Sequence, residues 1–155
     1  INPYEPQSKL SKCGSGCEWP CTECWNPITE FVASKVTSEC FKDTVRYCDT
    51  YWTGAADSSD HAGNAADCWP GTHAHGQLPS EQAVEDGWYV ARWLRQYAKP
   101  LKVSYVIWQN RIWSELHDEQ DWRLYDPAYS NTTNPTAKLV TDGHYDHVHF
   151  SVKGL

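Results

Sequence analysis

Residues 145–152 read YDHVHFSV, and this short stretch decides the fold that the sequence predicts. Apolar and polar side chains alternate along it, which is the period of a β-strand. The apolar members are Val148, Phe150 and Val152. Because these three must face the core, His147 and His149 share the opposite, polar face with Ser151. Two histidines on one face of a strand are close enough to act on one ligand, as in metal binding or proton transfer.

Helix signals dominate the first half of the chain, and strand signals dominate the second half. We expect one helix from Asn26 as N-cap and Pro27, a second over 39–52, and a third from Ser80 to about residue 98. Strands are predicted over 64–69, 102–109 and 145–152. Loops are predicted over 53–64, 70–79 and 127–143. Between residues 111 and 127 we expect a strand, a loop and a short helical piece. This order predicts an α+β domain, in which helices flank a largely antiparallel sheet.

The length of 155 residues suits a single domain, 1–155, with a core of its own. Residues 1–25 are rich in Pro, Gly and Cys, and we expect an irregular segment stapled by disulfides, while residues 26–155 supply the core. The seven cysteines are Cys13, Cys17, Cys21, Cys24, Cys40, Cys48 and Cys68. This density indicates an oxidising compartment and a secreted, extracellular protein, where disulfides suit the first four better than a zinc knot. An odd number leaves one thiol over.

The charge balance argues against one class of partner. Thirteen Lys and Arg against 20 Asp and Glu give a formal net charge of −7, so the basic stripe that nucleic acid requires is missing. No apolar run approaches the roughly 20 residues of a membrane span, so we expect no membrane partner. Nine Trp and nine Tyr are many for this length, and the excess favours a surface that stacks on sugar rings.

A second motif lies upstream, where residues 58–67 read SSDHAGNAAD. In the strand predicted at its end, Ala65, Asp67 and Trp69 share one face. Small residues beside an aspartate suggest a carboxylate in a partly buried place, where burial raises a carboxyl pKa and hydrogen-bond donors lower it. Either environment suits a functional acid.

Together the two motifs resemble a known fold. The pattern S-x-H-x-x-G-x-A-x-D followed far downstream by H-x-H is similar to that of the zinc DD-peptidase fold, shared by D-alanyl-D-alanine peptidases and Hedgehog-like domains. In that fold the first His, the Asp and the last His bind zinc. The resemblance implies a DD-peptidase/Hedgehog-like sheet for this chain.

A closer resemblance is to secreted domains that carry GTMATG, a helix, YVIWRQRIW and HYDHVHVSF. This chain has GTHAHG at 71–76, a helix, YVIWQNRIW at 105–113 and HYDHVHFSV at 144–152, in the same order. In fungi such domains occur beside an SH3-like wall-binding module, a combination that resembles a glycoside-hydrolase family of fungal muramidases. The resemblance implies bacterial peptidoglycan as the substrate without settling which bond is cut.

The upstream motif aligns with the zinc pattern in two ways. When the alignment is anchored on G-x-A-x-D, no gap is needed, and Asp60 takes the place of the first zinc-ligand histidine. When it is anchored on S-x-H, one residue is missing, and His61, Asp67 and His149 remain as zinc ligands. The two alignments predict different reactions, because paired carboxylates suit a glycosidase and a three-ligand zinc site suits amide hydrolysis.

The gap-free alignment leads to our main prediction, a muramidase that hydrolyses the glycan strand of peptidoglycan by carboxylate acid–base catalysis without a cofactor. The expected catalytic residues are Asp60, Asp67, His147 and His149. The expected substrate-binding residues are His73, His75, Trp108 and Asp146. The gapped alignment predicts a zinc peptidase that cuts the stem peptide, and a third hypothesis is a non-catalytic wall- or carbohydrate-binding domain. We expect the chain to act as a monomer.

Overall fold

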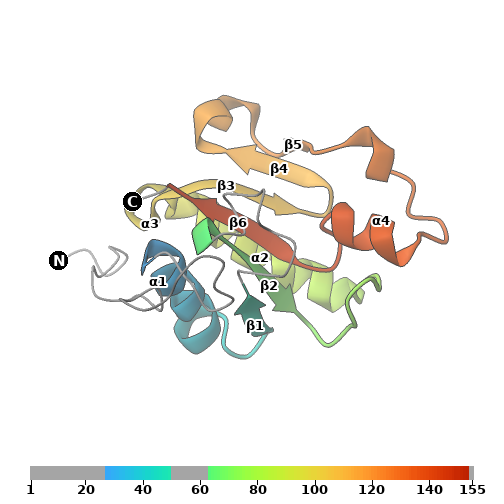
Figure 1. Ribbon diagram of the computed structural model, residues 1–155, viewed down its shortest axis with the longest axis horizontal. Helices are drawn as coiled ribbons and strands as arrows, with labels where there is room; N and C mark the ends of the chain where they lie inside the picture. The colour runs from blue at the N-terminus through green and yellow to red at the C-terminus, as the bar shows by residue number, and fades with distance from the viewer. Residues whose placement is uncertain (1–26, 50–62, 154–155) are drawn as a thin grey trace.

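The computed structural model describes residues 27–49 and 63–153, and within them the chain forms a six-stranded antiparallel sheet with helices packed on it (Figure 1). The strands are β1 (Val45–Asp49), β2 (Ala65–Pro70), β3 (Val103–Trp108), β4 (Arg111–Ser114), β5 (Arg123–Leu124) and β6 (Val148–Val152). The helices are α1 (Pro27–Lys35), the π-helix η1 (Val36–Cys40), α2 (Glu81–Gln96), α3 (Ala98–Leu101), the 3-10 helices η4 (Glu115–Gln120) and η5 (Pro127–Tyr129), and α4 (Ala137–Asp142). The predicted α+β class is confirmed.

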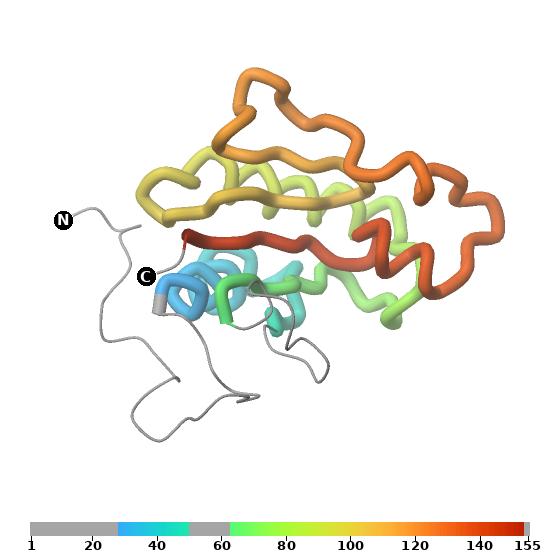
Figure 2. Tube along the Cα trace, turned by 45° about the horizontal axis from the view of Figure 1, so that its top comes forward, coloured from blue at the N-terminus to red at the C-terminus, as the bar shows by residue number. Residues whose placement is uncertain are grey.

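The strand predicted from YDHVHFSV is β6, and it lies inside the sheet. The strand order is β1-β2-β6-β3-β4-β5, and both Figure 1 and Figure 2 show β6 running between β2 and β3. The predicted alternation is confirmed, because Val148 and Phe150 are fully buried in the core. His147 and His149 are only 4% and 3% exposed, so the polar face of this strand is covered as well.

Helices α1 and α2 pack on the apolar face of the sheet. Helix α2 begins as predicted, since the Ser80 side chain accepts a hydrogen bond from the Ala83 N–H at 3.1 Å. It lies close against β3: a Cβ on Gly87 would be 2.2 Å from the Trp108 ring, so only glycine fits there. The Trp108 indole N–H donates to the Val84 carbonyl at 3.2 Å. The helices thus take one face, and the site residues of β2 and β6 point to the other.

The helix predicted over 39–52 is wrong, because this stretch contains β1 instead. Strand β1 pairs antiparallel with β2, and the disulfide between Cys48 and Cys68 joins opposed residues of the two strands. Pairing with a distant strand outweighs a helical spacing that is visible in the local sequence. The loop predicted over 127–143 is also partly wrong: α4 forms there, and Thr136 caps it by accepting from the Leu139 N–H.

Among the described cysteines, Cys40 is free and exposed. The predicted N-terminal segment, with its four cysteines, lies outside the described residues. None of the described helices is long and apolar enough to cross a membrane.

Candidate functional site

A row of polar residues crosses three neighbouring strands on the face opposite α1 and α2. In the antiparallel register, Asp49 of β1 is opposite Asp67 of β2, and Asp67 is opposite His149 of β6. Directly opposed residues point to the same face of a sheet, with Cβ atoms about 4.5–5.5 Å apart. The three strands therefore bring two carboxyl groups and an imidazole side by side.

Asp67 is the centre of this row. Its Oδ1 lies 2.9 Å from His149 Nδ1 and 3.5 Å from His147 Nε2. The other ring nitrogen of His149 lies 3.0 Å from the Ser151 hydroxyl, and the same ring stacks on Tyr105. The Asp67 side chain remains 13% exposed. A carboxylate is thus oriented by two fixed rings without being sealed from solvent.

His147 is held in place by a buried carboxylate. Its Nδ1 lies 2.7 Å from Oδ1 of Asp146, while Oδ2 of Asp146 accepts from the Gly76 N–H at 2.7 Å and from the Thr141 hydroxyl at 2.8 Å. Burial raises the pKa of Asp146, but His147 and these donors outweigh it and lower that pKa. Burial lowers the pKa of His147, but Asp67 and Asp146 outweigh it and raise that pKa. The pair is therefore ionic, and the imidazolium Nε2 is directed at Asp67.

The second carboxyl group of the row, Asp49, has a different electrostatic environment. Burial, and after it the charge of Asp67, raises the pKa of Asp49 more than the nearby His147 lowers it. A carboxyl group with a raised pKa lies beside a carboxyl group that two histidines contact. This is the arrangement expected of an acid–base pair.

Aromatic rings line the row on the side of the GTHAHG loop. His75 stacks on Trp69 with ring centroids 3.6 Å apart, and its Nε2 lies 2.5 Å from the Tyr47 hydroxyl. Trp69 also contacts the ring of His147, at 4.9 Å. Since Tyr47 is opposite Trp69 in the sheet, strands β1 and β2 set this stack as they set the carboxyl pair.

A pocket of about 300 Å³ borders Asp67 and His147. Its other lining residues are Tyr125, Tyr129, Thr141, Asp142 and His144. The His144 ring lies 4.7 Å from the His147 ring and 5.5 Å from the His149 ring. Burial, followed by the nearby His147 and His149, moves the pKa of His144 well below its ordinary value, so this ring is neutral. A carboxylate, an imidazolium and a neutral imidazole therefore meet at one pocket.

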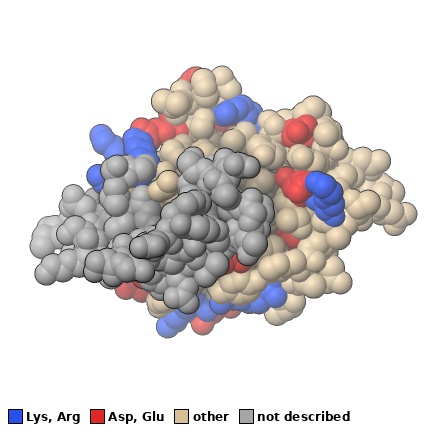
Figure 3. All heavy atoms as spheres, viewed as in Figure 1, with Lys and Arg blue, Asp and Glu red and all other residues tan. Residues whose placement is uncertain are grey.

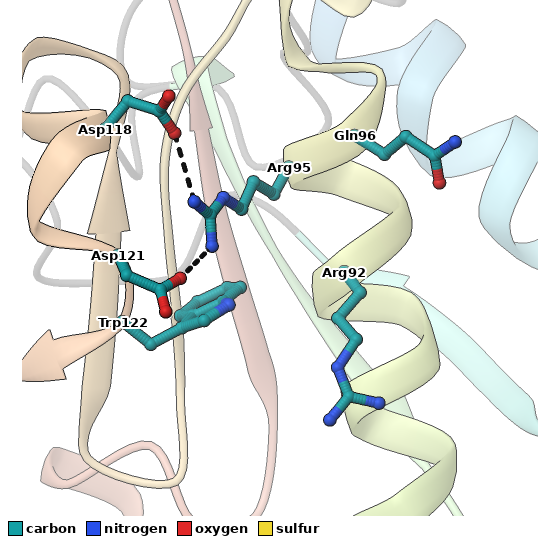
Figure 4. A pocket seen from close by; sticks show the side chains of 6 residues that line it. All are labelled: Arg92, Arg95, Gln96, Asp118, Asp121 and Trp122. Atoms are coloured by element: carbon teal, nitrogen blue, oxygen red, sulfur yellow. Dashed lines mark hydrogen bonds and ion pairs between the residues drawn. The ribbon is translucent and has the colours of Figure 1, made fainter.

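A larger pocket of about 610 Å³ lies between α2 and the segment that follows β4 (Figure 4). Arg95 forms ion pairs there with both Asp118 and Asp121, whose side chains are 65% and 70% exposed. The guanidinium of Arg92 packs over the Trp88 ring at 5.5 Å. Charges that are exposed and mutually paired are common on protein surfaces, and Figure 3 shows basic and acidic side chains interspersed elsewhere on the described surface. The smaller pocket, with its buried charges, is the stronger candidate site.

The structure brings together most residues predicted for the site. Asp67, His147 and His149 form one cluster, and His75 stacks beside it as described above. His73 lies next to it, with Nε2 2.7 Å from the Asp146 carbonyl oxygen. Asp146 is fully buried, so it acts on the site through His147 rather than by contact with a substrate.

The prediction that Trp108 binds substrate is wrong. This side chain is fully buried and packs in the core under α2, because the close approach of Gly87 makes room for its indole ring. Asp60 and His61, on which the two alignments differ, lie outside the described residues.

Sequence reasoning missed Asp49, His144, Tyr125 and Tyr129. Asp49 was hidden by the wrong helix, although Val45, Tyr47 and Asp49 alternate as a strand would. His144 was visible only as a neighbour of the strand, and the tyrosines lie in and just before a stretch predicted to be a loop. Only the folded chain places these residues around one pocket.

Two of the predicted zinc ligands lie side by side. Asp67 Oδ1 and His149 Nδ1 are 2.9 Å apart, which is a hydrogen-bonding distance. Within residues 27–49 and 63–153, however, no group of three or more His, Cys, Asp or Glu side chains is arranged to hold a metal ion. The third predicted ligand, His61, is outside these ranges, so the described residues include only two of the three predicted ligands.

Comparison with known proteins gives one family. Residues 21–136 match the family model described as the VldE C-terminal domain, which is more than half of the chain. Searches of the curated proteins and of the solved structures each give no match. The matched range includes both carboxyl groups of the row, Asp49 and Asp67, and ends before α4 and β6.

Proposed function

We propose that this chain, which belongs to the family of VldE C-terminal domains, is a secreted muramidase that hydrolyses the glycan strand of bacterial peptidoglycan. The family description names no reaction, so the proposal rests on the site. The observation that carries it is the cross-strand pair of Asp49 and Asp67. Most glycosidases place two carboxyl groups on either side of the bond that they cleave.

The two carboxyl groups have different roles in this proposal. Asp49, whose pKa is raised by burial and by Asp67, keeps a proton and donates it to the glycosidic oxygen as the bond breaks. Asp67, contacted by His147 and His149, serves as the anion on the other side of the bond. Asp49 thereby takes the part that the sequence prediction gave to Asp60.

The histidines support Asp67 rather than react themselves. The ion pair with Asp146 fixes the ring of His147, so that its charged Nε2–H points at Asp67 and favours the carboxylate form. His149 holds the same oxygen from the other side and is fixed by Ser151. Catalytic groups need such support, because a small displacement from the productive geometry lowers the rate strongly.

The cross-strand spacing also predicts the stereochemistry of the reaction. Directly opposed residues are close neighbours on one face of a sheet, and retaining glycosidases place their carboxyl groups closer together, about 5–5.5 Å apart, than inverting ones do. We therefore propose that Asp67 acts as the nucleophile and that the anomeric configuration is retained. Proton NMR of the first sugar anomer released from a glycan fragment tests this, and an inverted first product would contradict it.

Peptidoglycan is proposed as the substrate on three supports. The resemblance of GTHAHG, YVIWQNRIW and HYDHVHFSV to secreted wall-active domains implies it. Aromatic rings flank the carboxyl pair at Trp69 and at the pocket. The disulfide between Cys48 and Cys68 suits a secreted enzyme that meets bacterial walls outside the cell.

The test is digestion of purified peptidoglycan, with the new chain ends identified by mass spectrometry. New reducing sugar ends, released by the wild-type chain and not by Asp67→Asn, are the expected result. New amino groups on the stem peptide would replace this proposal with the second candidate below. An absence of either product, with retained binding to the wall, would favour a non-catalytic carbohydrate-binding domain.

A zinc peptidase is the second candidate, and it is supported by the proximity of two of its predicted ligands, Asp67 and His149. In this candidate Asp67, His149 and His61 would hold the metal, which when bound supplies a Lewis acid and an activated water for amide hydrolysis. The digestion above is therefore run with and without a chelator. Activity that is lost with chelator and restored by zinc would support the peptidase, whereas unchanged activity would support the glycosidase.

A further inference from the structure

We propose that His144 and Tyr125 form the sugar-binding wall of the pocket beside Asp67, with the His144 ring hydrogen-bonding a polar substituent of one sugar ring and Tyr125 packing on its apolar face. This inference rests on the proposed glycan substrate, and it names the residues that bind the glycan. Neither residue belongs to the row of Asp49, Asp67 and His149. Both line the pocket that this row borders.

The backbone around His144 gives the first argument. Helix α4 ends in a Schellman motif: the His144 N–H donates to the Thr141 carbonyl at 3.0 Å, and the Tyr145 N–H donates to the Val140 carbonyl at 2.9 Å. The residue in the left-handed position of this motif is usually glycine, yet here it is His144, with φ of 57°. A side chain is present where the backbone favours none, and such strain is characteristic of functional positions.

The ring nitrogens of His144 give the second argument. Its Nδ1 is buried and has no hydrogen-bond partner. The backbone of Asp142 is the hydrogen-bond partner of this ring, and the ring lines the pocket. His144 thus presents to the pocket a ring whose hydrogen-bonding capacity is only partly used. Polar groups in ligand pockets are typically few and left available in this way.

Tyr125 completes the wall from another segment. Its ring meets the His144 ring edge-to-face at 5.2 Å and is nearly parallel to that of Tyr129, with centroids 6.4 Å apart. Tyr125 is 39% exposed, so part of its ring is free to contact a ligand. An aromatic face beside a hydrogen-bonding ring suits a sugar, which has an apolar C–H face and polar edges. A volume of about 300 Å³ lies at the small end of ligand pockets and suits one such ring.

The turn between β3 and β4 holds both parts of the wall in place. Gln109 and Asn110 both have positive φ, as a two-residue type I′ hairpin turn requires. The Gln109 N–H donates to the His144 carbonyl at 2.8 Å, and the Asn110 carbonyl accepts from the Tyr125 N–H at 2.8 Å. The buried Asn110 side chain makes two more hydrogen bonds, to the backbone of Asp126. One rigid turn thus fixes the distance between His144 and Tyr125 before a ligand arrives.

The test uses His144→Gly, because glycine relaxes the left-handed backbone while removing the ring. We expect the melting temperature to stay equal or rise, and the affinity for a sugar ligand to fall by about tenfold with the loss of one hydrogen bond and a ring contact. The probe is the tetramer of N-acetylglucosamine, titrated calorimetrically into the full chain. A merely structural role for the His144 ring predicts the reverse, a less stable variant with unchanged affinity, and that result would overturn the proposal.

Tyr125 is tested with a matched pair of variants. Tyr125→Ala should weaken binding by about tenfold, and Tyr125→Phe by no more than about twofold, since the ring remains. Tyr89→Ala removes another exposed tyrosine, on α2, and should change nothing. Equal affinity of Tyr125→Ala and the wild-type chain would refute the proposed wall.

The binding readout separates this proposal from the proposed reaction. A chain that binds the tetramer through His144 and Tyr125 but releases no reducing ends from peptidoglycan would keep the wall and refute the muramidase. A chain that releases reducing ends with unchanged KM in both variants would keep the muramidase and refute the wall. A wild-type chain that neither binds the tetramer nor releases reducing ends would refute both.

Discussion

The pocket beside Asp67 and the pocket around Arg95 both contain charged residues, but they differ in how those charges are placed. In the larger pocket, Arg95 joins Asp118 and Asp121 on the surface, where water screens each charge. In the smaller pocket, the charges of His147 and Asp146 are almost completely buried. Burial strengthens each interaction and also makes each ionisation depend on its neighbours.

This difference shows that the size of a pocket is a weaker guide to function than the electrostatic state of its lining. The pKa of His147 is raised and the pKa of His144 is lowered in the lining of the smaller pocket, and the pKa of Asp49, opposite Asp67 in the sheet, is raised. Around the larger pocket, the Trp113 indole N–H and Arg95 lower the pKa of the exposed Asp118, which stays ionised as it would in water. If the two pockets differ in function as they do in charge, substitutions beside the smaller pocket should have the larger effects on activity.

The largest effect is expected from Asp67→Asn. The amide keeps the shape of the side chain and removes the negative charge that His147 and His149 contact, so activity on glycan should fall about 10³-fold or more. Release of reducing ends measures the activity, and circular dichroism checks the fold. Asp67→Asn with near-wild-type turnover would show that the buried row is not the active site.

A smaller loss, about 10²-fold, is expected from Asp49→Asn, because the proton donor is removed while the anion remains. The wild-type chain should lose activity as the pH rises through the raised pKa of Asp49, since the acid then loses its proton. The variant should lack this basic limb of the pH profile. A profile with the same basic limb in both chains would assign the proton donor to another group.

Asp49 also shows which parts of the structure can be predicted from the sequence and which cannot. The alternation in YDHVHFSV is local, so β6 and the shared face of its histidines could be predicted, and Ser80 as a cap could be predicted for the same reason. Strand β1 could not, because it depends on pairing with β2 some 20 residues away, where Cys48 bonds to Cys68. A second carboxyl group fixed by such a pairing is invisible until the register is known.

The sugar-binding wall of the pocket could not be predicted from the sequence, for a related reason. The wall is formed by three segments, which contain His144, Tyr125 and the turn at Asn110. Backbone hydrogen bonds join these segments, and sequence periodicity does not predict such bonds. The prediction for Trp108 was wrong for a different reason. An aromatic residue in a matching motif suggested a platform that stacks on sugar, whereas Gly87 leaves space for that ring inside the core. Composition indicates that aromatic residues are abundant, and only packing decides which of them face a ligand.

Asp146→Asn is expected to affect stability more than chemistry. It breaks a buried ion pair and should lower the free energy of unfolding by about 3 kcal/mol. The pKa of Asp146 is lowered in the folded chain, so its contribution is present above the unfolded value of about 3.9 and is lost as the pH falls through the folded pKa. The pKa of His147 is raised, so its contribution is present below about 6.5 and is lost as the pH rises through the folded pKa.

The difference in stability between the wild-type chain and Asp146→Asn should therefore be largest between about pH 4 and pH 6.5 and should shrink on either side. Urea unfolding of both chains at a series of pH values measures it. His144 titrates in the opposite sense, with a lowered pKa, but it is present in both chains and largely cancels in the difference. A difference that does not vary with pH would mean that Asp146 and His147 are not an ion pair.

The smallest effect is expected from Asp121→Asn in the larger pocket. It is the same change of side chain as Asp67→Asn, but it removes a carboxylate that is exposed and paired with Arg95, which retains its second partner, Asp118. Surface ion pairs contribute little, so the urea midpoint and the rate of glycan hydrolysis should both match those of the wild-type chain. The comparison is sharpest when the two variants are assayed on the same peptidoglycan preparation. A loss of turnover in Asp121→Asn comparable to that in Asp67→Asn would mean that the exposed pocket takes part in the reaction, and burial of charge would then no longer distinguish the two sites.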